Sequence, residues 1–163
     1  YGPGDLVTVA QLTKIAHKIA GIKVDGLRGT PANPKARGTW FEQYWLSAEQ
    51  LKWQLFREEN LDPARPATRS EVVATVLQAL DISRVWPRGE FFADVQPETK
   101  YAASIETAAN DAIVTGTISP TNSLVSYFRP FDPINRAEIA KMITNAIEIY
   151  KENSAEIQPD ALR

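Results

Sequence analysis

The chain has 163 residues, of which 44% are hydrophobic and 23% charged, and its formal net charge is −2. This composition is ordinary for a soluble globular domain, and the small net charge argues against wholesale binding to nucleic acid or to an anionic membrane. No apolar run approaches membrane-spanning length. The sequence contains no cysteine, which excludes disulfides, thiolate metal sites and a cysteine nucleophile.

The first predicted element is a helix from about Val9 to Ala20. Thr8 and Gln11 have the spacing of a capping box, in which each side chain accepts a hydrogen bond from the backbone N–H of the other residue. Gly21 is suited to end the helix, because glycine readily takes a left-handed conformation. His17 is the single histidine, so we expect a packed helix residue and no zinc site.

A second pair of helices is predicted in the middle of the chain. Residues 22–38 have the glycines, prolines and lack of periodicity of a surface loop. Residues 40–56 form an aromatic-rich helical pattern in which Trp53 is expected in the core. A proline-containing link then leads to a second capping box, formed by Thr68 and Glu71, and to a helix that reaches about Leu80.

The last part of the chain repeats this order. An apolar pattern from Tyr101 to Ile113 predicts a helix, which we expect Gly116 to close. A polar loop follows, with a short extended piece at about 125–128. Asn135 and Glu138 then form a third capping box, and the helix behind it is expected to fade into a polar tail.

The three caps lie roughly 60 and 67 residues apart, a period that suits a repeated helical hairpin. We therefore predict an all-α fold made of tandem helical-hairpin repeats. Residues 1–38 would hold a partial first repeat with only the capped helix and a loop, 39–90 the second repeat, 91–150 the third, and 151–163 a polar tail.

An ordered set of motifs in the third unit resembles the S-layer homology (SLH) domain. The family pattern comprises an F-x-D-V opening, an aromatic residue at the start of the first helix, a G-I-(I/V)-x-G ending, an F-x-P stretch and a capped T-R-A-E helix. The corresponding residues here are Phe92-Ala93-Asp94-Val95, Tyr101, Ala112-Ile113-Val114-Thr115-Gly116, Phe128-Arg129-Pro130 and Asn135-Arg136-Ala137-Glu138. The second unit matches through Trp40, Tyr44, Trp45 and Thr68-Arg69-Ser70-Glu71, and the first keeps only Thr8-Val9-Ala10-Gln11.

The resemblance implies a pseudo-threefold bundle that anchors an exported protein to an acidic, pyruvylated polysaccharide of the bacterial cell wall. It also implies a glycan site at the arginine of each capping box and at aromatic residues near the first helix of each repeat. In this sequence those residues are Arg69, Arg136, Trp45, Trp40 and Tyr101, with Arg129 in the F-x-P stretch. Val9 replaces the first arginine, so we expect one of three sites to be inactive.

The two box arginines are unusual on physical grounds. Arg69 and Arg136 occupy the first helical position, where the helix dipole disfavours a cation. A bound anion would explain them, because free N–H groups, the positive helix end and a guanidinium would converge on one carboxylate. The alternative is a salt bridge to an acid such as Asp94 or Asp132. If an anion is bound, replacing either arginine should weaken binding with little change in thermal stability.

We therefore expect a non-catalytic module of the bacterial cell surface that binds an acidic wall glycan without a cofactor or a metal. The alternative is a protein–protein assembly module, since an incomplete bundle could leave an apolar face for another envelope protein or a second copy. A glycan-cleaving enzyme would need two opposed carboxylates. The sequence does not pair Glu42, Asp94 or Asp111 in that way.

Overall fold

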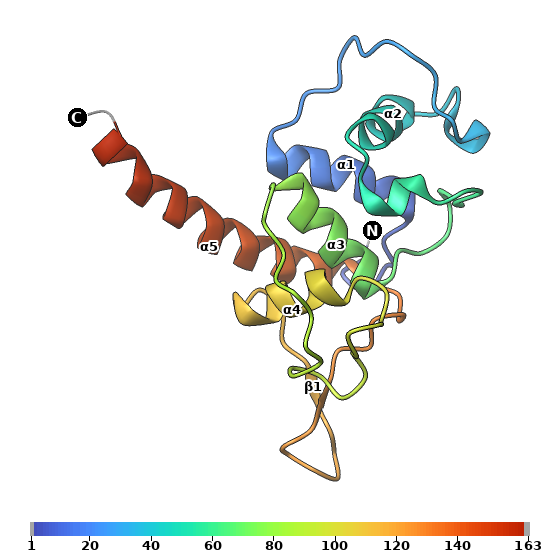
Figure 1. The fold of residues 1–163 in the computed structure, drawn as a ribbon. Coiled ribbons are helices and arrows are strands. Elements are labelled where there is room, and N and C mark those ends of the chain that lie inside the picture. Colours follow the sequence, from blue (N-terminus) through green and yellow to red (C-terminus); the bar gives the residue numbers. More distant parts are fainter. Residues whose placement is uncertain (1, 162–163) are drawn as a thin grey trace.

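The computed structural model describes the backbone of residues 2–161 and the side chains of residues 2–151. The described chain is mostly helical, with five α-helices, two short 3-10 helices and a two-stranded sheet (Figure 1). The elements in order are α1 (Val9–Ala20), η1 (Pro34–Ala36), α2 (Glu42–Gln50), η2 (Gln54–Arg57), α3 (Arg69–Ala79), α4 (Ala102–Asn110), β1 (Thr117–Ile118), β2 (Ser126–Tyr127) and α5 (Arg136–Ala161).

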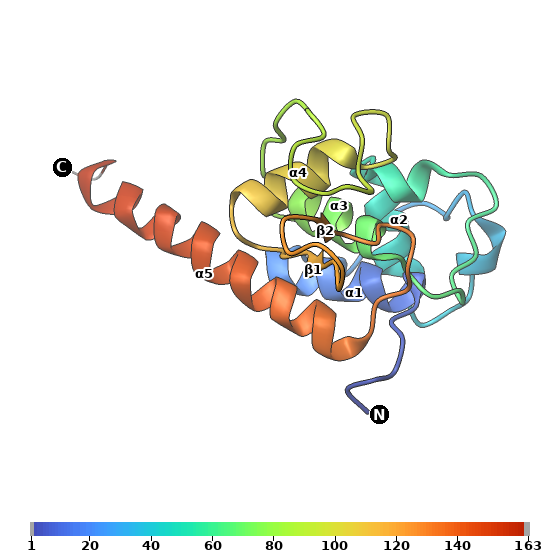
Figure 2. The same cartoon turned by 90° about the horizontal axis from the view of Figure 1, so that it is seen from below.

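Helix α3 lies at the centre of the molecule (Figures 1 and 2). It packs against α1 on one side and α4 on another, and η2 also contacts it, while α2 lies on α1. Because α3 has neighbours around most of its circumference, its apolar residues are almost fully buried, among them Val72, Val76 and Leu77. Such burial of large aliphatic side chains is the main source of stability in a domain of this size.

The segments that precede the three capped helices meet in a closed ring of hydrogen bonds. The N–H of Val7 donates to the carbonyl of Ile134 (3.0 Å), that of Ala67 to Val7 (2.8 Å), and that of Ile134 to Ala67 (3.1 Å). All three residues are buried, so the ring lies in the core. It ties together segments that are far apart in the sequence, because each supplies one donor and one acceptor that would otherwise be unpaired.

All three capping boxes are formed. Thr8 with Gln11 and Thr68 with Glu71 each make both reciprocal hydrogen bonds. In the third box, the N–H of Glu138 donates to the side chain of Asn135 (2.9 Å), and the N–H of Asn135 donates to Glu138 (3.0 Å). The first helix has the predicted bounds, and Gly21 ends it in the left-handed conformation with a φ of 66°.

The predicted helix over residues 40–56 is wrong in extent. Helix α2 ends at Gln50, and a separate 3-10 helix, η2, begins at Gln54. Between them Lys52 takes a left-handed conformation with a φ of 58°, and the N–H of Trp53 returns to the carbonyl of Ala48. This turn directs Trp53 into the core, where it is 4% exposed.

The expectation that Gly116 closes the preceding helix is also wrong. Helix α4 ends at Asn110, and Ala112 takes the left-handed conformation at its end, with a φ of 58°. Gly116 is required for a different reason, since a Cβ there would lie 2.7 Å from Cε1 of Phe92. The glycine thus allows the segment after α4 to pass close to a buried ring.

The extended piece predicted at 125–128 pairs with a strand that the sequence did not indicate. β1 and β2 are antiparallel, with Thr117 opposite Tyr127 and Ile118 opposite Ser126. They form the base of a hairpin that projects from the body, and α5 extends away in another direction (Figure 1). The backbone of α5 continues to Ala161, through most of the segment predicted to be a tail. None of the described helices combines the length and hydrophobicity that a membrane crossing requires.

His17 is a core residue that joins α1 to α2. Its Nδ1 lies 2.7 Å from the carbonyl of Thr13, and its Nε2 lies 2.8 Å from Oγ of Ser47. The Thr13 carbonyl can only accept, so Nδ1 carries the proton and Nε2 accepts from Ser47. The ring is fully buried, and this burial lowers the pKa of His17.

We expect the protein to lose stability as the pH falls below the value of about 6.5 at which an unfolded histidine titrates. The unfolded chain then binds a proton that the buried His17 resists, so the stability contributed by the neutral ring is fully present above about pH 6.5 and is lost as the pH falls. The free energy of unfolding, measured in urea at several pH values between 7.5 and 5, should fall more steeply for the parent protein than for His17→Gln. Equal slopes would contradict the prediction.

Candidate functional site

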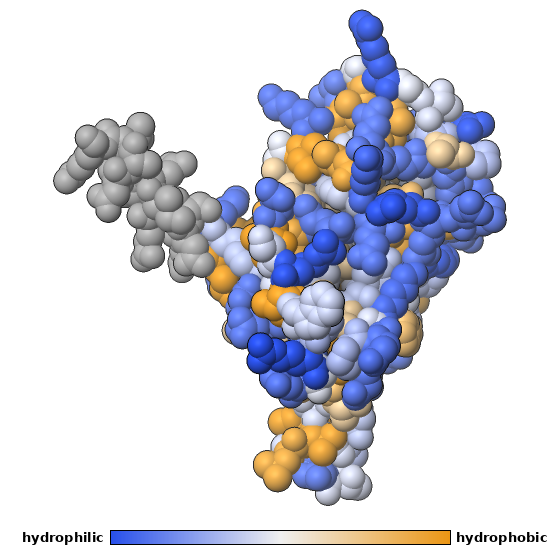
Figure 3. Space-filling view, in the orientation of Figure 1, coloured by the Kyte–Doolittle hydropathy of each residue, from blue (hydrophilic) through white to orange (hydrophobic). Residues whose placement is uncertain are grey.

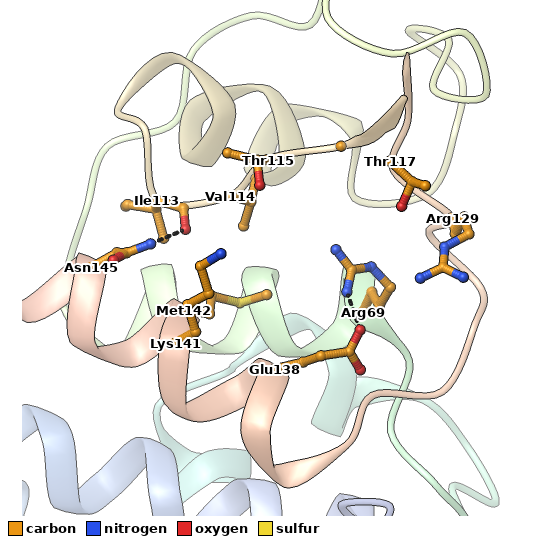
Figure 4. A pocket seen from close by; sticks show the side chains of 11 residues that line it. Arg69, Ile113, Val114, Thr115, Thr117, Arg129, Glu138, Lys141, Met142 and Asn145 are labelled. Atoms are coloured by element: carbon orange, nitrogen blue, oxygen red, sulfur yellow. Dashed lines mark hydrogen bonds and ion pairs between the residues drawn. The ribbon is translucent and has the colours of Figure 1, made fainter. Parts of the chain in front are cut away.

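A cleft of about 210 Å³ opens between α3, α5 and the segment that follows α4 (Figure 4). Arg69 contributes from the start of α3, residues 113–117 form the opposite wall, and α5 lines one side. The full lining comprises Arg69, Ile113, Val114, Thr115, Gly116, Thr117, Arg129, Glu138, Lys141, Met142 and Asn145. Ligand pockets for drug-sized molecules are typically about 300–1,000 Å³, so this cleft suits one small polar group.

Arg69 is held at the base of the cleft by Phe128 and by Glu138 of α5. Its Nε donates to the carbonyl of Phe128 (2.9 Å), and its Nη1 donates to Oε1 of Glu138 (3.1 Å). The guanidinium also lies over the ring of Phe128, 4.9 Å from the ring centroid. Burial lowers the pKa of Arg69, and Glu138 opposes this effect. The group stays positive at neutral pH, because an arginine titrates so far above that range.

Arg129 enters the cleft because Asp94 fixes the backbone beside it. The carboxylate of Asp94 accepts the N–H groups of Phe128 (2.8 Å) and Arg129 (2.7 Å). Arg129 itself has a φ of 59°, a conformation that costs energy for a residue with a side chain. Two charge-assisted hydrogen bonds offset that cost. The side chain is 49% exposed and makes a loose ion pair with Asp132 at 3.5 Å.

One face of α5 completes the cleft with Glu138, Lys141 and Asn145 (Figure 4). The amide of Asn145 donates to the carbonyl of Ile113 (3.1 Å), which fixes the opposite wall to the helix. Lys141 projects into the space between that wall and Arg69. The lining therefore has three cations, Arg69, Arg129 and Lys141, against the single carboxylate of Glu138. Glu138 pairs with Arg69, and Asp132 outside the lining pairs loosely with Arg129, so the net positive charge of the cleft is small, and it favours an anion over a cation.

The helix ends themselves do not offer the N–H groups that the sequence analysis assigned to an anion. At the start of α3, the N–H of Arg69 donates to the carbonyl of Asp132, that of Ser70 to Pro130, and that of Glu71 to the side chain of Thr68. The same pattern occurs at the starts of α1 and α5. The first three donors of α1, α3 and α5 are thus paired within the protein, so the free N–H groups expected to bind an anion at these helix starts are not there.

Arg69 and Arg136, the arginines of the second and third capping boxes, do not lie in the same site. Arg69 lines the cleft, whereas Arg136 is half-buried at the start of α5, away from the cleft lining. The acid that pairs with Arg69 is Glu138, and neither Asp94 nor Asp132 takes that role. Because Arg69 bridges two distant segments, its replacement should also lower stability, which corrects the expectation of an unchanged thermal stability.

The aromatic residues suggested for sugar stacking lie elsewhere. Trp45 is a core residue, 1% exposed, whose indole N–H donates to Glu49. Tyr101 is 6% exposed, and burial raises its pKa. Trp40 is 60% exposed and lies at a separate groove of about 400 Å³, with the ammonium of Lys14 5.7 Å from its ring centroid. None of the three lines the cleft at Arg69.

Sequence reasoning missed Lys141 and the wall formed by residues 113–117. One signal was available, because Glu138, Lys141 and Asn145 have the spacing of one helical face. That spacing does not indicate what the face meets. The described residues contain no group of three or more histidine or acidic side chains that could hold a metal ion. No protein-family model matches this chain, and neither does any curated protein.

Proposed function

We propose that this chain is a non-catalytic anchoring module of the bacterial cell surface, and that its cleft binds an acidic sugar unit of a cell-wall polysaccharide. The observation that supports this most strongly is the grouping of Arg69, Arg129 and Lys141 around a small polar cleft. The cleft walls also carry Thr115, Thr117 and the amide of Asn145, which suit the hydroxyl groups of a sugar.

The same proposal includes an SLH-like arrangement of repeats with pseudo-threefold symmetry. In its support, each capped helix is preceded by a buried residue of the hydrogen-bonded ring, namely Val7, Ala67 or Ile134. The equivalent N–H groups of Val9, Arg69 and Arg136 each donate at 3.0 Å to the segment before another cap. This scheme treats Val9, Arg69 and Arg136 as equivalent positions of the three repeats. The cleft at Arg69 is then the site that binds the glycan.

A comparison of two polymers tests the proposal. The affinity of the protein for a carboxylate-bearing wall polysaccharide should fall about tenfold or more when the carboxyl groups are chemically reduced to alcohols, because charge-assisted hydrogen bonds contribute about 1.5–3 kcal/mol each. Added salt should weaken binding of the acidic polymer in particular. Equal affinity for both polymers, measured by isothermal titration calorimetry, would refute the cleft as an anion site.

A second candidate is a module for protein–protein assembly. The observation that favours it is the hairpin formed by β1 and β2, which carries two exposed apolar side chains, Ile118 in β1 (63% exposed) and Leu124 in the connecting loop (93% exposed) (Figure 3). Contiguous exposed apolar surface often marks a contact with another protein. Light scattering over a range of concentrations separates the two roles, since a monomer at all concentrations excludes self-assembly through the hairpin.

A further inference from the structure

Trp86 lies on the surface, far outside the core. It is 86% exposed, more than any of the other three tryptophans. Arg84 and Arg88 flank it in the sequence, and both are exposed. In the described part of the chain, neither guanidinium forms an ion pair. The segment therefore offers a ligand an exposed aromatic face with a cation two positions away on either side in the sequence.

The segment is held firmly on both sides of the tryptophan by α4. The N–H of Val85 donates to Oγ1 of Thr107 (2.9 Å), and the N–H groups of Arg88 and Gly89 donate to the two carboxylate oxygens of Glu106 (2.7 and 2.5 Å). Glu106 and Thr107 are each 2% exposed. Two buried polar side chains of one helix thus fix the backbone around Trp86.

The residue after Trp86 is Pro87, which restricts the backbone further. The indole is therefore presented by a rigid loop, and a ligand that stacks on it would lose little loop entropy on binding. Beside the loop lies a groove of about 370 Å³, to which Arg84 contributes a wall together with Gln78, Trp53 and Ile82. The groove also carries the carboxylate of Asp81, and neither Trp86 nor Arg88 lines it, so the aromatic face and the two cations belong to the loop itself.

We propose that Trp86, with Arg84 and Arg88, forms a second contact site for the same acidic polysaccharide. The apolar face of a pyranose ring would stack on the indole, and its carboxylate would pair with one of the two guanidinium groups. This inference rests on the proposed function, since it assumes the ligand class of the cleft. The charge favours a sugar over an anionic bilayer, because membrane-binding basic segments usually carry about 4–8 lysines or arginines and this loop has two.

Two sites on one chain have a consequence that a single site lacks. A long polymer can occupy both, so its second contact forms at a high effective concentration, whereas a single-unit fragment gains nothing from the second site. Trp86→Ala should therefore lower the affinity for the polymer about tenfold or more, while the affinity of a one-unit fragment for the cleft stays unchanged. Leu124→Ala, which removes an equally exposed apolar side chain elsewhere, is the matched control.

Calorimetry with polymer and fragment, together with tryptophan fluorescence, distinguishes the outcomes. In the parent protein, polymer should shift the emission of the exposed indole, and Trp86→Phe should abolish that part of the change. If Trp86→Ala binds polymer like the parent while Arg69→Gln loses binding, the second site is refuted and the cleft stands. If neither variant changes polymer binding, both proposals fail. Trp86-dependent binding to phosphatidylglycerol vesicles without binding to polymer would overturn the assignment to a sugar.

Discussion

Replacement of Arg69 by glutamine is expected to reduce the affinity for an acidic saccharide about ten- to a hundredfold, because a hydrogen bond to a charged group contributes about 1.5–3 kcal/mol. Arg69 is the most enclosed of the three cations in the cleft, with a side chain 11% exposed. Its guanidinium is already oriented by Phe128 and Glu138, so it pairs with a ligand without first being ordered. Calorimetry with a carboxylate-bearing oligosaccharide measures the change.

Arg69 also has structural contacts, so a second variant must separate binding from folding. Arg129→Gln removes a half-exposed cation whose ion pair with Asp132 is long, and it should weaken binding with little loss of stability. Lys23→Gln changes the net charge equally at an exposed site in the 22–38 loop and serves as the control. If Arg129→Gln and Lys23→Gln bind alike and Arg69→Gln loses affinity only in proportion to unfolding, the cleft is not the binding site.

Replacement of Glu71 by alanine is expected to lower the free energy of unfolding by about 2 kcal/mol, because hydrogen bonds to a charged group contribute about 1.5–3 kcal/mol and the side chain of Arg65, 32% exposed, can be solvated once its partner is removed. Glu71 is 6% exposed. Its two oxygens accept from the guanidinium of Arg65 at 2.9 and 2.6 Å, and one of them also accepts the N–H of Thr68 at 2.8 Å. Burial alone would raise the pKa of Glu71, yet the bonds from Arg65 and Thr68 hold the pKa below its ordinary value.

Glu138→Ala is the matched comparison, because Glu138 has the same place in the third capping box. Its side chain is 34% exposed, and a single hydrogen bond of 3.1 Å links it to Arg69. We expect a loss of about 1 kcal/mol, the contribution of a helix cap. Urea unfolding of the two variants gives both values. A loss for Glu71→Ala no larger than that for Glu138→Ala would show that the pairing with Arg65 contributes nothing.

The capped helix starts could be predicted because a capping box depends on residues three positions apart. Thr8, Thr68 and Asn135 each have their partner within one turn, so the sequence contains both halves of the interaction. The end of α1 at Gly21 is local for the same reason. The sequence did not predict that the helices before Lys52 and Ala112 would end where they do. Both residues take left-handed conformations because the chain must turn into the core there.

The cleft could not be predicted from such rules, because its residues come from distant parts of the chain. Arg69 and Glu138 were both identified, but as members of separate capping boxes, and their pairing depends on how α3 and α5 pack. The sequence indicated Asp94 and Asp132 as partners of the arginines, since both lie near the right motifs. Asp94 instead orders the backbone that directs Arg129 into the cleft.

By itself the sequence determined where the capped helices begin and which of their faces are apolar, since backbone capping and side-chain periodicity act over a few residues. The tertiary structure decided that the segments before the caps close into a ring, that Trp45 belongs to the core and that Lys141 lines the same cleft as Arg69. Those outcomes depend on which distant surfaces are buried against one another, and burial is a property of the whole fold.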